Sequence, residues 1–280
     1  MKHLERYLDP SLPAEERAAD LLARLTPEEK MAQLCCAFLL RGDTERFRTQ
    51  CRHGIGTVTT LDMRRAETLE EAAQMQRTAQ QAVMEQSRFH IPAIFHMEGL
   101  CGAFIPGAAS LPAGIGRGSS WDPDLEKQLA QIVGRQERAV GITQTLAPVL
   151  DISRDSRMGR QGETYGEDPT LAARMGAAFV QGIQERKAGT PGTISDAVAP
   201  DTLSNTSSSG TISDAVGKHF LGFHNSEAVS MGRRVILQID FCRRFTESLS
   251  KQQSRKLGCV VSCLVIVRLT ASRFLPPGSF

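Results

Sequence analysis

The stretch that decides the fold is TLAPVLDISRDSRMGRQGETYGEDP, residues 145–169. It opens with a mostly apolar run, 145–152, and a short apolar run bounded by polar residues predicts a buried strand that ends at a surface. Asp168 and Pro169 then predict the start of a helix. Strand, charged loop and helix in this order are typical of a β/α barrel, in which the chemistry sits at the strand ends. The charged loop contains Arg154, Asp155, Arg157, Arg160, Glu163, Glu167 and Asp168.

Charged residues at this density need partners, water or a ligand. One interpretation is an ion-pair network that shapes the loop, since such networks also perturb charged groups. The other is a set of donors for the polar oxygens of a ligand, to which the planar fork of an arginine is suited. The spacing of the residues leaves both interpretations open.

The segment 147–169, APVLDISRDSRMGRQGETYGEDP, closely resembles the signature of glycoside hydrolase family 3, the β-glucosidase and β-xylosidase family. Met158 stands where that family usually has a tryptophan. The resemblance covers roughly residues 14–229 and implies a hydrolase of carbohydrate metabolism, a glycosidase with an α/β fold of the TIM-like (β/α)8 barrel type. A whole barrel runs to about 250 residues. About six strands can be placed here, so we predict an incomplete, truncated barrel.

The pattern of the chain predicts helices and strands in alternation. Helices are expected over 14–34 with a turn at Thr26-Pro27, over 66–87, over 122–140 and after Asp168. Strands are expected over 34–40, 55–61, 91–95, 145–152 and 215–220, with a sixth over 259–267. Between them, Gly107, Gly114, Gly116 and Gly118 predict a flexible loop. That loop lacks the full dinucleotide fingerprint, which excludes nucleotide binding there.

Two regions depart from this rhythm. GTISDAV occurs at 192–198 and again at 210–216, separated by a low-complexity stretch, and we predict a disordered insertion near residues 186–215. Residues 1–229 are predicted to form a partial family 3 N-terminal barrel domain. Residues 230–280 are predicted to be a divergent tail that partly continues the barrel. Because this tail is basic and loses the resemblance, we hypothesise that a shifted reading frame produced part of it.

The resemblance implies a substrate-binding set of four residues that grip sugar hydroxyls. Glu98 stands where the β-xylosidase-like branch of the family places a sugar-binding carboxylate on an acid-rich strand end. Arg160 lies in the charged loop, and Lys218 and His219 lie at the end of the fifth expected strand. Arg160 is preferred over Arg154, which is expected to brace the loop. Glu163 and Asp168 are assigned to loop structure and helix capping. Cys101 stands where the family usually has a histidine, which alters part of the site.

The resemblance implies a retaining mechanism, which needs two carboxyl groups roughly 5–5.5 Å apart. The family takes its nucleophilic aspartate from a Ser-Asp pair followed by an aromatic residue on a seventh strand, and its acid/base from a later domain. No such motif follows residue 229, and the pairs Ser195-Asp196 and Ser213-Asp214 lie before the Lys-His strand. We therefore assign no catalytic residue, so that enzymatic activity is uncertain and the isolated chain is expected to be inactive. The alternative is a non-catalytic sugar-binding remnant or an inactive gene product.

Composition bounds the remaining classes. The chain has 280 residues, 41% hydrophobic and 23% charged, as in an ordinary soluble protein, and its net charge of +2 implies no acidic partner. The basic tail lacks a nucleic-acid recognition motif, and no apolar run is long enough for a membrane span. Seven cysteines without framework spacing, and an N-terminus without a signal-peptide core, predict free thiols and a cytoplasmic protein. We expect a small β-glycoside or oligosaccharide as partner, no metal or organic cofactor, and self-association through open barrel edges.

Overall fold

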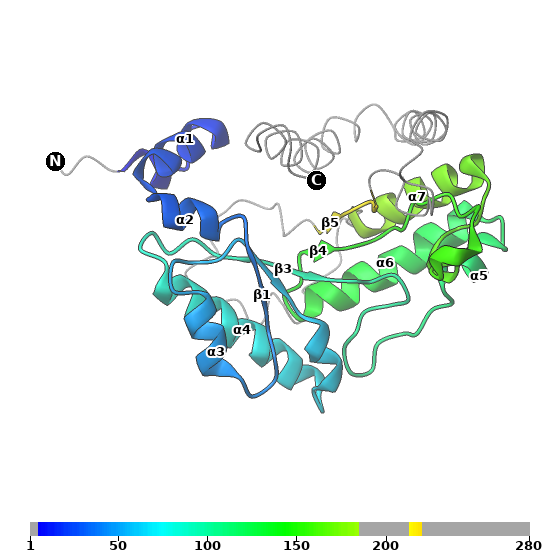
Figure 1. Ribbon diagram of the computed structural model, residues 1–280, viewed down its shortest axis with the longest axis horizontal. Helices are drawn as coiled ribbons and strands as arrows, with labels where there is room; N and C mark the ends of the chain where they lie inside the picture. Colours follow the sequence, from blue (N-terminus) through cyan, green and yellow to red (C-terminus); the bar gives the residue numbers. More distant parts are fainter. Residues whose placement is uncertain (1–4, 185–212, 220–280) are drawn as a thin grey trace. The chain divides into compact units, whose positions relative to one another are not determined.

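A computed structural model describes residues 5–184 and 213–219 of the chain (Figure 1). It divides into two compact units, Met1–His96 and Met97–Phe280. Parallel strands alternate with helices, and the hydrogen-bonded strand order is β1-β2-β3-β4-β5, the order of the sequence. The expected α/β fold with a parallel barrel-type sheet is confirmed, and the described residues contain five strands of that sheet.

The first unit builds three parallel strands against two helices. Along the strands, Ala37, Val58 and Phe95 are paired in register and buried, because alternate residues of a strand point to the same face. The opposite face carries Phe38, which is 59% exposed, and Ile94, which is 45% exposed. The elements of this unit are η1 (Arg6–Leu8), α1 (Ala14–Arg24), α2 (Pro27–Ala32), β1 (Cys36–Phe38), α3 (Thr44–Gln50), β2 (Thr57–Thr59), η2 (Leu61–Arg65), α4 (Leu69–Gln86) and β3 (Ile94–Met97).

Two long helices of the second unit, α6 (Pro123–Ala139) and α7 (Pro169–Gln184), lie side by side (Figure 1). Small residues permit their close approach: a Cβ at Gly182 would lie 2.4 Å from the carbonyl oxygen of Lys127. Met175, Phe179 and Ile183 of α7 are buried in the hydrophobic core of this unit. The elements of this unit are α5 (Gly114–Gly118), α6 (Pro123–Ala139), β4 (Gln144–Thr145), η3 (Ser156–Met158), η4 (Gln161–Glu163), α7 (Pro169–Gln184) and β5 (Asp214–Ala215).

Side-chain caps begin the helices where the sequence predicts them. Thr26 and Glu29 form a reciprocal capping box at the start of α2, each side chain bonding to the other's backbone N–H. Asp122 accepts hydrogen bonds from two amides at the start of α6. The Oδ1 atom of Asp168 accepts from Thr170 at 2.6 Å and Leu171 at 2.9 Å, so its predicted capping role at α7 is confirmed.

The structure corrects several sequence expectations. The glycine-rich stretch forms the short helix α5, and Gly114 is required for close packing, since a Cβ there would lie 2.2 Å from the carbonyl oxygen of Glu163. The strand expected over 145–152 is assigned only at Gln144–Thr145. Ser213 is described by the structure, and Asp214 and Ala215 form the fifth strand, so the predicted insertion extends too far. The sixth strand, the tail and the rest of the insertion lie outside the described residues.

The side chain of Arg138 joins the two described segments that flank residues 185–212. Its Nη1 atom donates to the carbonyl oxygen of Ile183 at 3.2 Å and to the hydroxyl of Ser213 at 3.1 Å. Ile183 is near the end of α7, and Ser213 immediately precedes β5. One guanidinium therefore holds the end of the last described helix beside the start of the last described strand.

A buried ion pair fixes the loops of the second unit to α6. Arg117 and Glu126, whose side chains are 5% and 0% exposed, lie 2.8 Å apart. Arg117 also donates to the carbonyl oxygens of Leu100 at 2.7 Å and Pro112 at 2.5 Å, and the hydroxyl of Tyr165 donates to Glu126 at 2.5 Å. The network thus ties three separate loop segments to a single helix.

Within the described residues, no helix is long and apolar enough to cross a membrane. Four cysteines lie in this part of the chain, Cys35, Cys36, Cys51 and Cys101, and all are free thiols.

We predict that Arg117→Met lowers the free energy of unfolding by about 3–5 kcal/mol, because it leaves the buried Glu126 carboxylate without its counter-charge. Urea unfolding followed by circular dichroism measures the change. Arg6→Met, which removes an exposed cation paired with Glu16, is the matched control and should leave stability nearly unchanged. Equal effects of the two substitutions would contradict the anchoring role of Arg117.

Candidate functional site

Strand β4 brings the ends of its two neighbours to the same edge of the sheet. On one side, the N–H of Leu146 donates to the carbonyl oxygen of Met97 at 2.7 Å. On the other, the carbonyl oxygen of Thr145 accepts from the N–H of Val216 at 2.9 Å. Because parallel strands present their carboxyl ends at one edge, Glu98 and Lys218 emerge near each other despite their distance in the sequence.

Glu98 and Lys218 form an ion pair through Oε2 and Nζ. Their side chains are 29% and 13% exposed, so the pair lies at the surface of the sheet edge and is partly shielded from water. The backbone of Lys218 is fixed by two further bonds, from its N–H to the carbonyl oxygen of Pro148 at 2.9 Å and from the N–H of Leu150 to its carbonyl oxygen. Both the backbone and the charge of Lys218 are therefore positioned.

His219 is oriented by Asp151, a residue that the sequence analysis did not single out. The Oδ2 atom of Asp151 lies 2.8 Å from Nδ1 of His219 and accepts from its backbone N–H at 3.0 Å. Asp151 is only 1% exposed. Its position inside the apolar run 145–152 could have indicated its role, because a carboxylate in a buried strand requires a hydrogen-bonding or charged partner.

Arg160 and Glu163 form a two-pronged ion pair in the loop before α7. The Nε atom of Arg160 lies 2.7 Å from Oε1 of Glu163, and Nη2 lies 2.6 Å from Oε2. Hydrogen bonding from Arg160 lowers the pKa of Glu163, to which the charges of Lys218 and His219 also contribute. Hydrogen bonding to Glu163 in turn raises the pKa of Arg160, assisted by Glu98 and Asp151. Glu163 thus has the structural role predicted for it.

The structure therefore brings the four sequence-predicted residues, Glu98, Arg160, Lys218 and His219, into one electrostatic cluster, and adds Asp151 and Glu163 to it. The cluster has three cationic or basic donors and three carboxyl groups. Such an arrangement offers both donors and acceptors to a ligand rich in hydroxyl groups.

Two other loop residues from the sequence analysis, Arg154 and Cys101, are not part of the cluster. Arg154 is exposed, and the ion pair that shapes this part of the loop joins Arg157 to Asp155 at 2.7 Å. Cys101 is partly buried, and burial raises the pKa of its thiol, which favours the neutral form.

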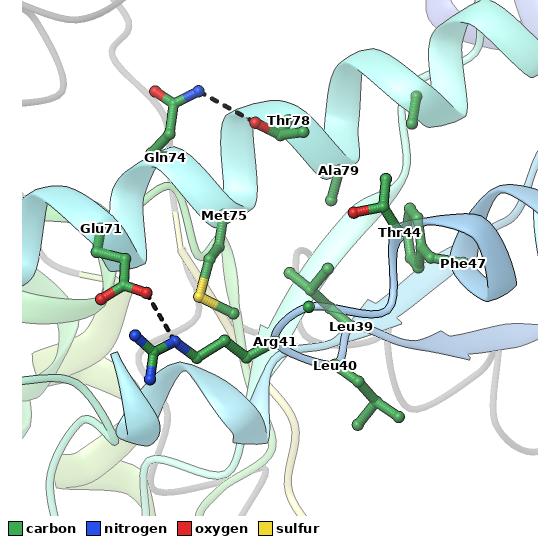
Figure 2. A pocket seen from close by; sticks show the side chains of 12 residues that line it. Leu39, Leu40, Arg41, Thr44, Phe47, Glu71, Gln74, Met75, Thr78 and Ala79 are labelled. Carbon is green, nitrogen blue, oxygen red and sulfur yellow. Dashed lines mark hydrogen bonds and ion pairs between the residues drawn. The ribbon is translucent and has the colours of Figure 1, made fainter. Parts of the chain in front are cut away.

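A small apolar pocket lies in the first unit, and none of the cluster residues lines it. It has a volume of about 200 Å³ and lies between α4 and the segment that follows β1. Figure 2 shows Met75 and Leu39 facing the pocket, with the ion pair of Arg41 and Glu71 beside them. Among the described residues, no group of three or more potential ligands could hold a metal ion.

The described strands and helices are those of a parallel α/β barrel. In barrel proteins the functional site lies at the carboxyl ends of the strands, which is where the charged cluster lies. The sequence profile of the glycosyl hydrolase family 3 N terminal domain matches residues 26–249. The chain belongs to this family. The predicted resemblance is therefore confirmed.

Individual relatives agree with this assignment. A putative β-xylosidase from Formosa agariphila is 28% identical over 225 residues, which are 78% of this chain and 28% of the relative. A β-glucosidase structure from Erythrobacter marinus is 29% identical, with a TM-score of 0.63 over 79% of this chain and 27% of the other. A β-glucosidase from Listeria innocua in complex with glucose is 25% identical, with a TM-score of 0.50 over 61% and 24%. The chain thus spans less than a third of the length of each.

We predict that Asp151→Ala lowers the free energy of unfolding by about 1–3 kcal/mol, because it leaves two donors of His219 without their acceptor. Asp151→Asn keeps one acceptor oxygen and should lose less. Urea unfolding measures both. Asp155→Ala, in the same loop but paired with the 68% exposed Arg157, is the control, and a larger loss there than at Asp151 would refute the ranking.

Proposed function

We propose that this chain supplies the sugar-binding part of a β-glycosidase that acts on β-glucosides or β-xylosides. The observation that carries the proposal is the ion pair between Glu98 and Lys218, which joins two strand ends at the edge where barrel enzymes bind their substrates. The family membership of the chain supports the reaction class, and the named activities of its relatives support the two sugars.

Each charged group has a defined task in this proposal. The carboxylate of Glu98 accepts hydrogen bonds from ring hydroxyls, while Lys218 donates to them. His219, oriented by Asp151, and Arg160, held by Glu163, add directional donors from the other side of the cluster. Because the charges are already paired and oriented, less conformational entropy is lost when a sugar binds.

The hydrolytic step itself requires two carboxyl groups, one as nucleophile and one as acid/base. We propose that neither comes from the described cluster, whose carboxylates are engaged with basic partners. In the retaining mechanism proposed for the parent enzyme, both would come from another part of the protein or from another chain. The alternative is a module that binds sugar without cleaving it, which a hydrolysis assay distinguishes.

Self-association is a further part of the proposal. On the sheet of the first unit, Phe38 and Ile94 expose apolar surface on one face. Exposed apolar faces and open strand edges favour pairing with another chain.

We predict that the purified chain binds glucose or xylose, measured by calorimetry, and that Lys218→Met weakens binding about tenfold to a hundredfold. Loss of a hydrogen bond from a charged donor costs about 1.5–3 kcal/mol, which corresponds to that range. Lys30→Met, an identical change at an exposed position on α2, is the matched control and should bind as the unmodified chain does.

The same proteins are tested for hydrolysis of aryl β-glucoside and β-xyloside. No turnover with retained sugar binding would support a binding part without its own catalytic pair. Turnover that Lys218→Met abolishes would instead show that this chain carries a nucleophile. Failure of the folded chain to bind either sugar would refute the proposed function.

A further inference from the structure

A further buried carboxyl lies close to the site, and no step of the proposed function uses it. Glu137 belongs to α6, and its side chain is 0% exposed. Its Oε2 atom is hydrogen bonded to the hydroxyl of Thr145, which is also 0% exposed. Its Oε1 atom is buried and has no hydrogen-bond partner among the described residues.

Thr145 gives this carboxyl a direct connection to both sides of the site. It lies in β4, where its carbonyl oxygen bonds to Val216, two residues before Lys218. The next residue, Leu146, bonds to Met97, which immediately precedes Glu98. The hydroxyl bonded to Glu137 thus belongs to one of the two consecutive residues, Thr145 and Leu146, whose backbone bonds join the strand segments that precede Lys218 and Glu98.

Gly99 gives the carboxyl a second connection to Glu98. Its backbone adopts φ +60°, which favours glycine, and packs closely over the buried carboxyl. A Cβ at this position would lie 2.7 Å from Oε1 of Glu137 and 2.3 Å from Cγ2 of Thr145. Gly99, the residue that follows Glu98, therefore packs against the carboxyl of Glu137.

We propose that Glu137 is a positioning residue for the sugar site, which in its neutral form supports Thr145 and Gly99 and thereby holds Glu98 and Lys218 in place. Ionisation would put a charge in a dry site where one oxygen has no donor. Hydrating that charge would require Thr145 and Gly99 to move, which would disturb the ion pair above them. The inference rests on the proposed function for its sugar readout.

The surroundings of Glu137 support a neutral carboxyl at neutral pH. Burial raises its pKa to about 8, against the opposing effects of Thr145 and the positive charge of Arg138. On α6 the charged neighbour is Arg138. The other groups in contact, Thr145 of β4 and Gly99 after β3, carry no charge, and Glu98 and Lys218 lie beyond them.

The sign of the pH dependence follows from this shift. Between the ordinary pKa of a glutamate and about 8, the folded chain holds a proton on Glu137 that the unfolded chain has lost. Stability is therefore greatest on the acid side of this window, falls as the pH rises through it, and becomes constant above the folded pKa.

We expect sugar affinity to fall about tenfold between about pH 6 and about pH 9, because only about one chain in ten then keeps the neutral carboxyl. Glu137→Gln keeps the shape and a neutral group, and should bind as the unmodified chain does at the lower pH. Its affinity should change much less at the higher pH. Calorimetry with glucose and with xylose gives the values, and Glu85→Gln, at an exposed position on α4, is the control.

Nuclear magnetic resonance keeps this inference separate from the proposed function. The side-chain carboxyl carbon of Glu137 and the backbone amide of Gly99 should titrate together near the same pH, and the Gly99 titration should vanish in Glu137→Gln. If no sugar binds at any pH but both signals titrate together, the proposed function fails while the support of Gly99 by Glu137 stands. A carboxyl that titrates at the ordinary pKa of glutamate, or a Gly99 amide that ignores it, overturns the inference. So does a sugar affinity whose pH dependence is the same in Glu137→Gln.

Discussion

The second unit depends on the burial of a charge pair between Arg117 and Glu126. Removing two charges from water is costly unless each remaining donor and acceptor is also satisfied. Here the guanidinium reaches two carbonyl oxygens, and the carboxylate accepts from Tyr165. That requirement fixes the loop after Glu98 and the loop after Glu163 to the same helix. The buried network therefore helps to position the charged cluster at the strand ends, although no residue of the cluster belongs to that network.

The cluster is organised before any ligand arrives. Glu98 is paired with Lys218, His219 with Asp151, and Arg160 with Glu163. The attraction between paired opposite charges offsets the repulsion between like charges, and pairing restricts long side chains that would otherwise sample many rotamers. Its cost is that a sugar hydroxyl must share these partners, so each new hydrogen bond gains less than it would with an unengaged ion. A site of this kind favours orientation over raw affinity.

The sequence predicted the long helices, because caps such as Thr26 and Asp168 act on the nearest backbone groups, but it missed the short helices α3 and α5. It found the strands but not their limits, since those depend on hydrogen bonds to distant segments such as the one from Val216 to Thr145. The four cluster residues were found through a family resemblance rather than through physical pattern. Nothing in the sequence distinguished Arg117 in its glycine-rich stretch, or Glu137 from the other polar residues of an amphipathic helix. Their roles depend on partners that only the folded chain brings near.

The two hydrogen bonds of Arg138 carry a consequence for the duplicated sequence. Because they hold Ile183 and Ser213 to one guanidinium, these bonds fix the two ends of the span between them whatever the number of residues in that span. The two copies of GTISDAV make one change of that number especially simple. Excision of residues 199–216 would place the first copy, with Ser195, Asp196 and Ala197, directly before Gly217 in place of Ser213, Asp214 and Ala215. The duplication is thus a place where this lineage can lengthen or shorten without moving Lys218 out of register.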